Sequence, residues 1–213
     1  MSSRVCWIVG AGDFCPDGLR PRTGDYVIAA DGGFQFLSDL GLPADMVLGD
    51  FDSLGSVPDH KNVVRHPSVK DDTDMMLAVQ KGFELGYSRF ALYGGLGGRL
   101  DHTLANVQTL MYISRRGGRG FLTGSGIIIT SITDGTICFD ASFCGYISVF
   151  CLCETARGVT LRGLKYTLER GTLEPSVARG VSNEFCGVPS SVSVENGTLV
   201  ATFSGELERV LRV

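Results

Sequence analysis

Clusters of carboxylates at successive turns are the feature of this sequence that most restricts its fold. Three groups of aspartates follow short apolar runs or open a helical pattern, at Ala30-Asp31-Gly32-Gly33, Gly49-Asp50-Phe51-Asp52-Ser53 and Lys70-Asp71-Asp72-Thr73-Asp74. An α/β fold collects its functional loops at the carboxyl ends of its strands. Carboxylates repel one another unless a cation lies between them, and hard oxygen ligands suit Mg²⁺. The sequence therefore predicts acidic loops that meet around a metal ion.

Two fixed cations and a glycine-rich segment accompany these acids. Lys70 precedes the third acidic group, and Arg99 follows Gly94-Gly95-Leu96-Gly97-Gly98. Glycines before an arginine and a helix start favour close approach of the backbone to a phosphate group. The segment is not a Walker A loop, because no Gly-Lys-Ser/Thr follows. We therefore expect phosphate binding beside the metal.

Several of these residues also have a purely structural explanation. Asp31 suits a turn whatever its function, and one residue of 71–74 is expected to cap a helix. Asp50 and Asp52 point more strongly to function, because two like charges so close together need a cation between them.

The same alternatives apply after Arg99. Asp101 suits a helix N-cap, and His102 suits a surface histidine. His102 and Asn106 are four residues apart and share a helix face, so a ligand at the helix start would lie near both.

Composition and charge exclude several classes of protein. The 213 residues form one large domain or two small ones, and the net charge of -4 argues against nucleic-acid binding. The apolar runs are too short to span a bilayer, so no membrane association is expected. Seven cysteines without a C-x-x-C pair predict free thiols in a reducing compartment. We expect a cytoplasmic protein.

The first half of the chain alternates apolar runs with helical patterns. Buried strands are predicted at 4–11, 26–30, 46–48, 62–66, 90–93 and 120–123, with helices beginning near Phe34, Asp71 and Leu100. The last helix is predicted to bury a face formed by Leu100, Leu104, Val107 and Met111. This alternation predicts an N-terminal parallel sheet in a three-layer α/β/α domain, residues 1–123.

The second half, residues 124–213, consists of short β-rich runs with turn signals. Strands are predicted at 127–133, 136–139, 146–153, 191–195 and 198–203. Asn196-Gly197 lies between the last two and predicts a two-residue hairpin. This half is expected to be an antiparallel β-sandwich or barrel domain.

In combination, these motifs resemble the thiamine pyrophosphokinase (thiamine diphosphokinase) family. The resemblance extends over most of the chain and includes Gly163-Leu164-Lys165-Tyr166 and Val181-Ser182-Asn183-Glu184 in the β-rich half. It implies an enzyme that transfers diphosphate from ATP to the hydroxyl of thiamine, giving thiamine diphosphate and AMP. It also implies an ATP- and Mg-binding catalytic domain, a thiamine-binding β-sandwich domain, and a homodimer with shared active sites.

The resemblance implies roles for individual residues. Mg²⁺ and the triphosphate would be held by Asp50, Asp52, Asp71 and Asp74, which with Arg99 form the catalytic set. ATP would be bound by Asp31, Lys70, Thr73, Gly97, Gly98, Arg99, Asp101, His102 and Asn106. Thiamine would contact Ser182 and Asn183, with Phe185 as the nearest aromatic candidate. Asp71 or Asp74 would accept the proton of the thiamine hydroxyl, and the sequence does not choose between them.

Two alternatives remain open at this point. One is a Mg²⁺-dependent phosphohydrolase with Asp50 as nucleophile, although the glycine segment and Arg99 suit a nucleotide better. The other is a non-catalytic sensor of nucleotide or thiamine. Release of AMP rather than inorganic phosphate separates the first alternative from the kinase.

Overall fold

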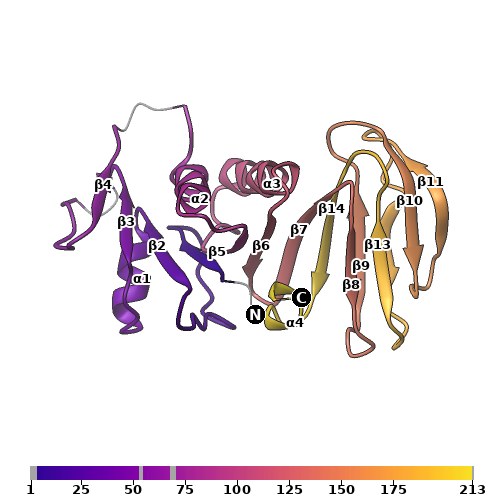
Figure 1. Cartoon of the computed structure of the whole chain (residues 1–213), viewed down its shortest axis with the longest axis horizontal. Coiled ribbons are helices and arrows are strands. Elements are labelled where there is room, and N and C mark those ends of the chain that lie inside the picture. The colour runs from indigo at the N-terminus through magenta and orange to yellow at the C-terminus, as the bar shows by residue number, and fades with distance from the viewer. Residues whose placement is uncertain (1–3, 53–54, 68–70, 213) are drawn as a thin grey trace. The chain divides into compact units, whose positions relative to one another are not determined.

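The chain forms two compact units (Figure 1). The structure is a computed structural model that describes residues 4–52, 55–67 and 71–212. The first unit comprises Met1–Thr109 with Leu122–Ser125, and the second comprises Leu110–Phe121 with Gly126–Val213. Within the described residues, no helix combines the length and the apolar character needed to cross a membrane.

A parallel β-sheet forms the centre of the first unit. Its strands lie in the order β5-β1-β2-β3-β4, with the bounds β1 Cys6–Val9, β2 Tyr26–Ala30, β3 Met46–Gly49, β4 Val63–Arg65 and β5 Arg89–Tyr93. β1 is paired on both sides, with Cys6 opposite Tyr26 of β2 and Phe90 of β5. All four of its residues are buried, as expected for a central parallel strand. The predicted parallel sheet is confirmed.

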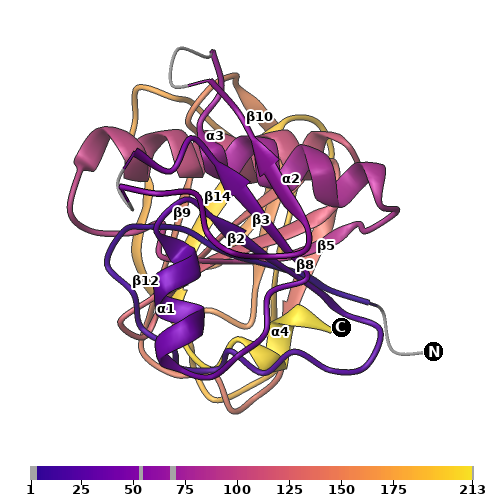
Figure 2. The same ribbon diagram turned by 90° about the vertical axis from the view of Figure 1, so that its left-hand side faces the viewer.

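Helices cover both faces of this sheet (Figures 1 and 2). α1 (Gly33–Asp39) lies on one face, and α2 (Asp74–Glu84) lies on the other together with the beginning of α3 (Leu100–Arg115). This is the predicted three-layer arrangement, in which each helix buries one side against the strands.

The strand order creates a switch point beside β1. The chain runs outward from β1 through β2, β3 and β4, and then returns to place β5 on the other side of β1. The loops after β1 and β5 therefore leave the sheet side by side. They are joined by hydrogen bonds from the Gly10 amide to the Tyr93 carbonyl and from the Gly12 amide to the Gly94 carbonyl, both 2.8 Å. Ligands of open α/β sheets bind in the crevice at such a point.

The predicted buried face of α3 is wrong in its first half. Leu100 is 72% exposed and Leu104 is 59% exposed, whereas Leu110 and Ile113 are fully buried. The buried face also carries polar residues, among them Asn106, whose side-chain amide donates a hydrogen bond to the Gly95 carbonyl. The spacing of apolar residues does not predict such a face, because a buried polar residue with a hydrogen-bond partner interrupts the apolar pattern.

The second unit contains two antiparallel sheets. The strands lie in the orders β12-β9-β14-β7 and β11-β10-β13-β8. Their bounds are β7 Ile127–Thr133, β8 Thr136–Phe139, β9 Tyr146–Phe150, β10 Ala156–Arg162, β11 Leu168–Leu173, β12 Gly180–Glu184, β13 Ser190–Ser193 and β14 Thr198–Ser204. Two further elements are β6 (Arg119–Gly124), which contributes to both units, and α4 (Glu208–Leu211). β10, β11 and β12 were not predicted as strands, and β9 ends before the predicted Cys153.

Aromatic packing joins the two sheets of the second unit. Phe139 of β8 and Phe203 of β14 belong to different sheets, and their ring centroids are 4.9 Å apart. Phe143 and Phe185 contact the same Phe139 ring at 5.2 and 5.1 Å. Edge-to-face pairs of this kind stabilise a core beyond the area that they bury. The predicted β-sandwich is confirmed.

The predicted hairpin at Asn196-Gly197 is wrong. β13 pairs with β8 and β10, whereas β14 pairs with β7 and β9, so the turn carries the chain from one sheet to the other. The backbone of the turn bonds to other segments: the Gly197 amide donates to the Asp134 carboxylate and the Asn196 carbonyl accepts from the Arg157 amide. The turn itself was predicted correctly, but turn residues alone do not specify which strands pair.

The corrected face of α3 predicts different costs for two leucines of one helix. Leu110→Ala should lower the free energy of unfolding by about 2–5 kcal/mol, because it leaves a cavity in the core. Leu104→Ala, the matched control on the exposed face, should change it by less than about 0.5 kcal/mol. Urea unfolding followed by circular dichroism measures both values. Equal losses would show that the assigned face is wrong.

Candidate functional site

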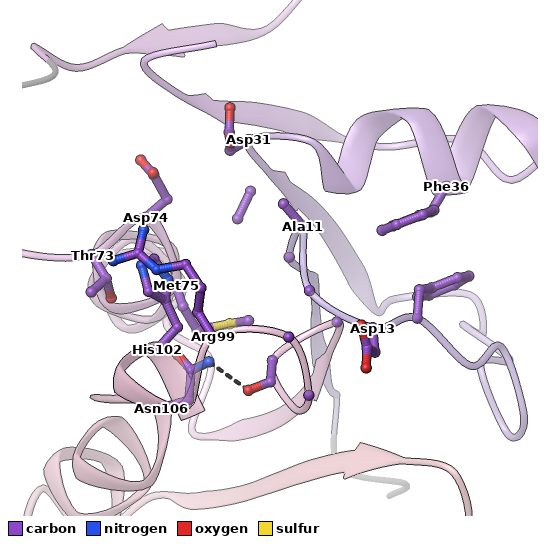
Figure 3. A pocket seen from close by; sticks show the side chains of 18 of the residues that line it. Ala11, Asp13, Asp31, Phe36, Thr73, Asp74, Met75, Arg99, His102 and Asn106 are labelled. Carbon is purple, nitrogen blue, oxygen red and sulfur yellow. Dashed lines mark hydrogen bonds between the residues drawn. The ribbon is translucent and has the colours of Figure 1, made fainter. Parts of the chain in front are cut away.

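A cavity of about 990 Å³ opens in the first unit at the switch point (Figure 3). Its wall consists of residues 10–14 after β1, Ala30 and Asp31 at the end of β2, Asp50 after β3, residues 72–75 at the start of α2, and the segment after β5 with His102 and Asn106 of α3. Apart from Asn106 in the second turn of α3, these groups come from the carboxyl ends of strands or the first turns of helices. Such ends carry the unpaired backbone groups and polar loops that ligands use.

The acidic part of the wall agrees with the sequence prediction only in part. Asp31, Asp50 and Asp74 line the cavity, as does Asp72, which had no assigned role. Asp52 and Asp71 are exposed and do not line it. Lys70 lies outside the described residues.

The backbone around Asp50 is held close to Asp31. The Asp31 amide donates to the Leu48 carbonyl of β3 at 2.7 Å. A Cβ at Gly49 would lie 3.1 Å from the Asp31 Cα, so only glycine allows this approach. Phe51 has a φ of 64°, an unfavourable conformation for a residue with a side chain, and it is 2% exposed, so the burial of its ring offsets the backbone strain and anchors the loop. The Asp52 amide donates to the Asp50 carboxylate at 3.1 Å, which fixes that side chain.

Thr73 caps the helix in the third acidic group. Its hydroxyl accepts from the Met76 amide at 3.2 Å. Thr73 therefore provides the N-cap of α2, and neither Asp72 nor Asp74 is needed for that role. Both of these aspartates line the cavity. Asp72 also accepts from the Gln80 side chain at 3.0 Å. The negative charges thus lie at the positive end of the helix dipole.

The glycine segment after β5 is held in place from two sides. Asn106, 5% exposed, donates from its side-chain amide to the Gly95 carbonyl at 2.8 Å. On the other side, the Asp13 amide donates to the Leu96 carbonyl at 3.1 Å. A Cβ at Gly97 would overlap the Asp13 carboxylate, and the φ of Gly97 is 76°. Gly97 therefore has a structural reason for its identity in addition to the predicted phosphate contact.

Arg99 and Asp101 form a forked ion pair at the start of α3. Arg99 Nη2 and Nε donate to the two Asp101 oxygens at 2.6 and 3.2 Å. This hydrogen bonding raises the pKa of Arg99 and lowers the pKa of the Asp101 carboxyl. Arg99 and His102 line the cavity, whereas Asp101 does not. Asp101 therefore orients Arg99 from outside the cavity.

The acidic wall suits a metal ion that arrives with a phosphate ligand. Across residues 4–52, 55–67 and 71–212, no group of three or more His, Cys, Asp or Glu side chains is arranged to hold a metal ion. Mg²⁺ is commonly held by one or two carboxylates, with waters and substrate phosphates as its other ligands. The oxygen donors of Asp50 and Asp74 fit that mode of binding.

In the second unit, the two motifs of the β-rich half meet in one structure. The Asn183 side chain of β12 accepts from the Tyr166 amide at 2.9 Å and donates to the Tyr166 carbonyl at 2.7 Å. Lys165 donates from its backbone to the Glu184 carbonyl and forms an ion pair with the Glu184 carboxylate at 2.6 Å. That carboxylate raises the pKa of Lys165.

The predicted thiamine contacts differ in how accessible they are. Ser182 is exposed, at a φ of 58° in a bulged part of β12 rather than in a loop. Asn183 is 3% exposed and Phe185 is 9% exposed, within the aromatic core. Tyr166, 60% exposed, was not predicted as a contact, and its backbone is held by the Asn183 side chain.

Sequence analysis missed the loop after β1. Asp13 and Phe14 line the cavity, as do Phe36 of α1 and Met75 of α2. Gly10-x-Gly12 lacks the third glycine of a dinucleotide fingerprint, so the motif by itself does not indicate a nucleotide site. The useful signal was its place after the first strand, but its importance depends on β5 lying beside β1, which the sequence does not reveal.

The fold and the cavity together define a class of protein. A parallel α/β sheet with carboxylates, an arginine and a glycine segment at its switch point is typical of nucleotide-dependent phosphotransferases.

Comparison with known proteins identifies the family within this class. Residues 22–120 match the model of the thiamin pyrophosphokinase catalytic domain, and residues 135–199 match that of the thiamin pyrophosphokinase vitamin B1 binding domain. These matches cover more than half of the chain, which therefore belongs to the thiamine pyrophosphokinase family. This is a family of enzymes, transferases that make thiamine diphosphate.

Individual relatives agree with this assignment. The chain is 28% identical to thiamin pyrophosphokinase 1 of Caenorhabditis elegans, over 76% of this chain and 70% of the relative. It is 27% identical to thiamine pyrophosphokinase of Bacillus subtilis, over 81% of this chain and 84% of the relative. The crystal structure of a thiamine pyrophosphokinase from Bacillus subtilis superposes with a TM-score of 0.84 at 26% identity, covering 96% of this chain and all of the other.

The Arg99–Asp101 pair predicts a specific titration. Because Arg99 stabilises the ionised form, Asp101 should titrate below the ordinary aspartate range, and the pair should separate only as the pH falls through that lowered pKa. In Arg99→Gln the Asp101 pKa should rise towards its ordinary value. NMR titration of the carboxyl carbons measures this change. Asp140, whose pKa is lowered mainly by Ser142, is the matched control and should not respond. An unchanged Asp101 pKa in Arg99→Gln would show that the two side chains are not paired in solution.

Proposed function

We propose that this chain catalyses the family's reaction in the cavity of its first unit, transferring diphosphate from ATP to thiamine and releasing AMP. The observation that carries the proposal is the convergence of Asp31, Asp50, Asp74 and Arg99 on one cavity beside a glycine segment. A volume of about 990 Å³ is at the upper end of typical ligand sites and is sufficient for a nucleotide.

The chemistry follows from positioning and charge. The thiamine hydroxyl oxygen attacks the β-phosphorus of ATP, the new P–O bond forms, and the bond between the β-phosphorus and the oxygen that bridges to the α-phosphate breaks. AMP leaves with that oxygen. Arg99, oriented by Asp101, stabilises negative charge on the phosphate oxygens with a planar fork. Asp74 accepts the hydroxyl proton in preference to Asp71, because Asp74 lines the cavity and Asp71 does not.

The carboxylates would hold Mg²⁺ together with the triphosphate. Asp50 and Asp74 are the proposed direct ligands, Asp74 through one oxygen only, which leaves its second oxygen to accept the hydroxyl proton. Asp52 and Asp71 add negative charge nearby. The ion would neutralise phosphate charge and align the reacting groups.

Other residues of the wall are proposed to bind ATP without taking part in bond making. Asn106 acts through the glycine segment, since its amide fixes Gly95. Asp31, Lys70, Thr73, Gly97, Gly98 and His102 complete the proposed nucleotide set.

Thiamine recognition is proposed for the second unit. Ser182 and Tyr166 are exposed and can contact a ligand, whereas Asn183 positions Tyr166. The exposed Tyr166 ring is better suited than the buried Phe185 to stack on thiamine. A homodimer with shared active sites is part of the proposal. So is a cytoplasmic location, since ATP is the substrate and all seven cysteines are free thiols.

The reaction and its metal site are tested together. The wild-type protein incubated with ATP, Mg²⁺ and thiamine should form equal amounts of AMP and thiamine diphosphate, measured by chromatography. Asp50→Asn should reduce turnover by at least a hundredfold, because the asparagine amide binds Mg²⁺ poorly. The fold should persist, since asparagine can still accept from the Asp52 amide.

Asp59→Asn is the control, since Asp59 is exposed and lies outside the cavity wall. Full activity in Asp50→Asn would contradict the metal assignment. Inorganic phosphate as the only product would favour the phosphohydrolase.

The thiamine contact predicts a split between the two substrates. Tyr166→Ala should raise the KM for thiamine about tenfold with little change in the KM for ATP, because only stacking on the acceptor is lost. Tyr112→Ala, which removes a tyrosine from α3, should change neither value. Equal effects of Tyr166→Ala on both substrates would indicate general damage to the protein.

The same variant tests the shared site. Tyr166→Ala and Asp50→Asn chains, co-expressed with different tags and isolated as a heterodimer, should recover thiamine affinity and turnover in one of two sites. A proven heterodimer without recovery would show that each chain forms its site alone.

A further inference from the structure

One corner of the cavity is aromatic. Phe14 of the loop after β1 and Phe36 of α1 stack with ring centroids 4.8 Å apart and planes at 7°. Both rings line the cavity and are half-buried, so part of their apolar surface is available to a ligand. Tyr93 of β5 contacts Phe14 at 6.4 Å between centroids and supports it from the sheet. The corner therefore offers a rigid surface for a flat ring.

A carboxylate lies in the same corner. Asp13 precedes Phe14, lines the cavity and is exposed. Its backbone is fixed by the bond to Leu96, and its carboxylate rests against the Cα of Gly97. Among the described residues, the Asp13 side chain has no hydrogen-bonding or ion-pair partner. It is therefore an unpaired acceptor on a fixed backbone, which a ligand can use.

This acceptor determines which part of a nucleotide fits here. A carboxylate without a nearby cation repels phosphate, and Asp13 has no ion-pair partner among the described residues, so the polyphosphate is better placed beside Arg99. Figure 3 shows Asp13 and Phe36 on one side of Ala11, with Asp74, Arg99 and His102 on the other. The phosphate-binding groups and the aromatic corner thus occupy different parts of one cavity, as the two ends of a nucleotide would.

Two substrate rings carry an amino group on an aromatic heterocycle, the base of ATP and the pyrimidine of thiamine. The vitamin B1 binding model matches residues 135–199, whereas this corner is formed by residues 13–36 of the first unit. The base is therefore the better occupant.

We propose that Asp13, Phe14 and Phe36 form the nucleobase subsite, and that the Asp13 carboxylate selects purines with a 6-amino group over those with a 6-oxo group. The amino group donates to Asp13 while the ring packs on the phenylalanines. In the same pose a 6-oxo group would place its oxygen against the carboxylate, so that two acceptors would face each other without a donor. The inference rests on the proposed function for its ligand, a nucleoside triphosphate.

The test compares ATP with inosine triphosphate, which has a 6-oxo group in place of the amino group. Calorimetry measures the binding of each nucleotide with Mg²⁺, and steady-state assays measure kcat/KM with saturating thiamine. The wild type should prefer ATP by at least tenfold. Asp13→Asn should reduce that preference at least fivefold, because the asparagine amide can donate to the 6-oxo oxygen.

The aromatic surface is tested on one helix. Phe36→Leu should weaken binding of both nucleotides about tenfold, with the KM for thiamine unchanged. Phe34→Leu is the matched control, since Phe34 lies on α1 outside the cavity wall and packs against His60. It should leave nucleotide binding unchanged.

Each outcome separates the subsite from the reaction. An unchanged ATP preference in Asp13→Asn, with normal formation of AMP, would overturn the subsite and leave the function intact. A changed Mg²⁺ requirement in place of a changed preference would make Asp13 a metal ligand and also overturn it. A raised KM for thiamine alone would assign the corner to thiamine. Asp13-dependent binding of ATP without turnover would support the subsite and contradict the function. Absence of nucleotide binding in the wild type would overturn both.

Discussion

The structure depends on the close approach of two loops at the end of the parallel sheet. Hydrogen bonds from Gly10 and Gly12 to the β5 side join the loop after β1 to the glycine segment. A Cβ on Gly94 would overlap the Gly10 carbonyl, so the contact requires glycine there. β1 and β5 are neighbours because the chain returns across the sheet after β4. Their contact therefore places the aspartates that follow β2 and β3 near Arg99, which follows β5.

The charge distribution follows from that arrangement. Four carboxylates on one wall are stable together only with compensating groups, and the structure supplies several. The start of α2 carries Asp72 and Asp74 at its positive end, and the Asp50 carboxylate accepts a backbone amide. Arg99 is neutralised in part by Asp101, which orients its guanidinium. The remaining negative charge is what the proposed Mg²⁺ would offset, and the proposed ligand is for that reason a metal–nucleotide complex rather than a free nucleotide.

Local signals in the sequence predicted the acidic loops, the strands of the first unit and the capping of α2, because each depends on residues close together in the chain. Three features needed tertiary information. Asp13 and Phe14 matter only once β5 is known to lie beside β1. The buried side of α3 includes Asn106, whose burial depends on the distant Gly95 carbonyl. Asn196-Gly197 marks a turn in either case, but its neighbours pair with strands of different sheets.

In the second unit, hydrogen bonds join two segments that are separate in the sequence. The amide of Asn183 satisfies both its donor and its acceptor on the backbone of Tyr166, seventeen residues away. It is buried and bonded through both its oxygen and its nitrogen, so it cannot turn towards a ligand without leaving backbone groups unsatisfied, which costs more than a single surface hydrogen bond returns. The segment at 163–166 is thereby fixed to β12, and Tyr166 is presented to solvent on a rigid support. Asn183, which the sequence suggests as a direct ligand contact, thus has a structural role in the fold, since it holds the backbone that carries Tyr166.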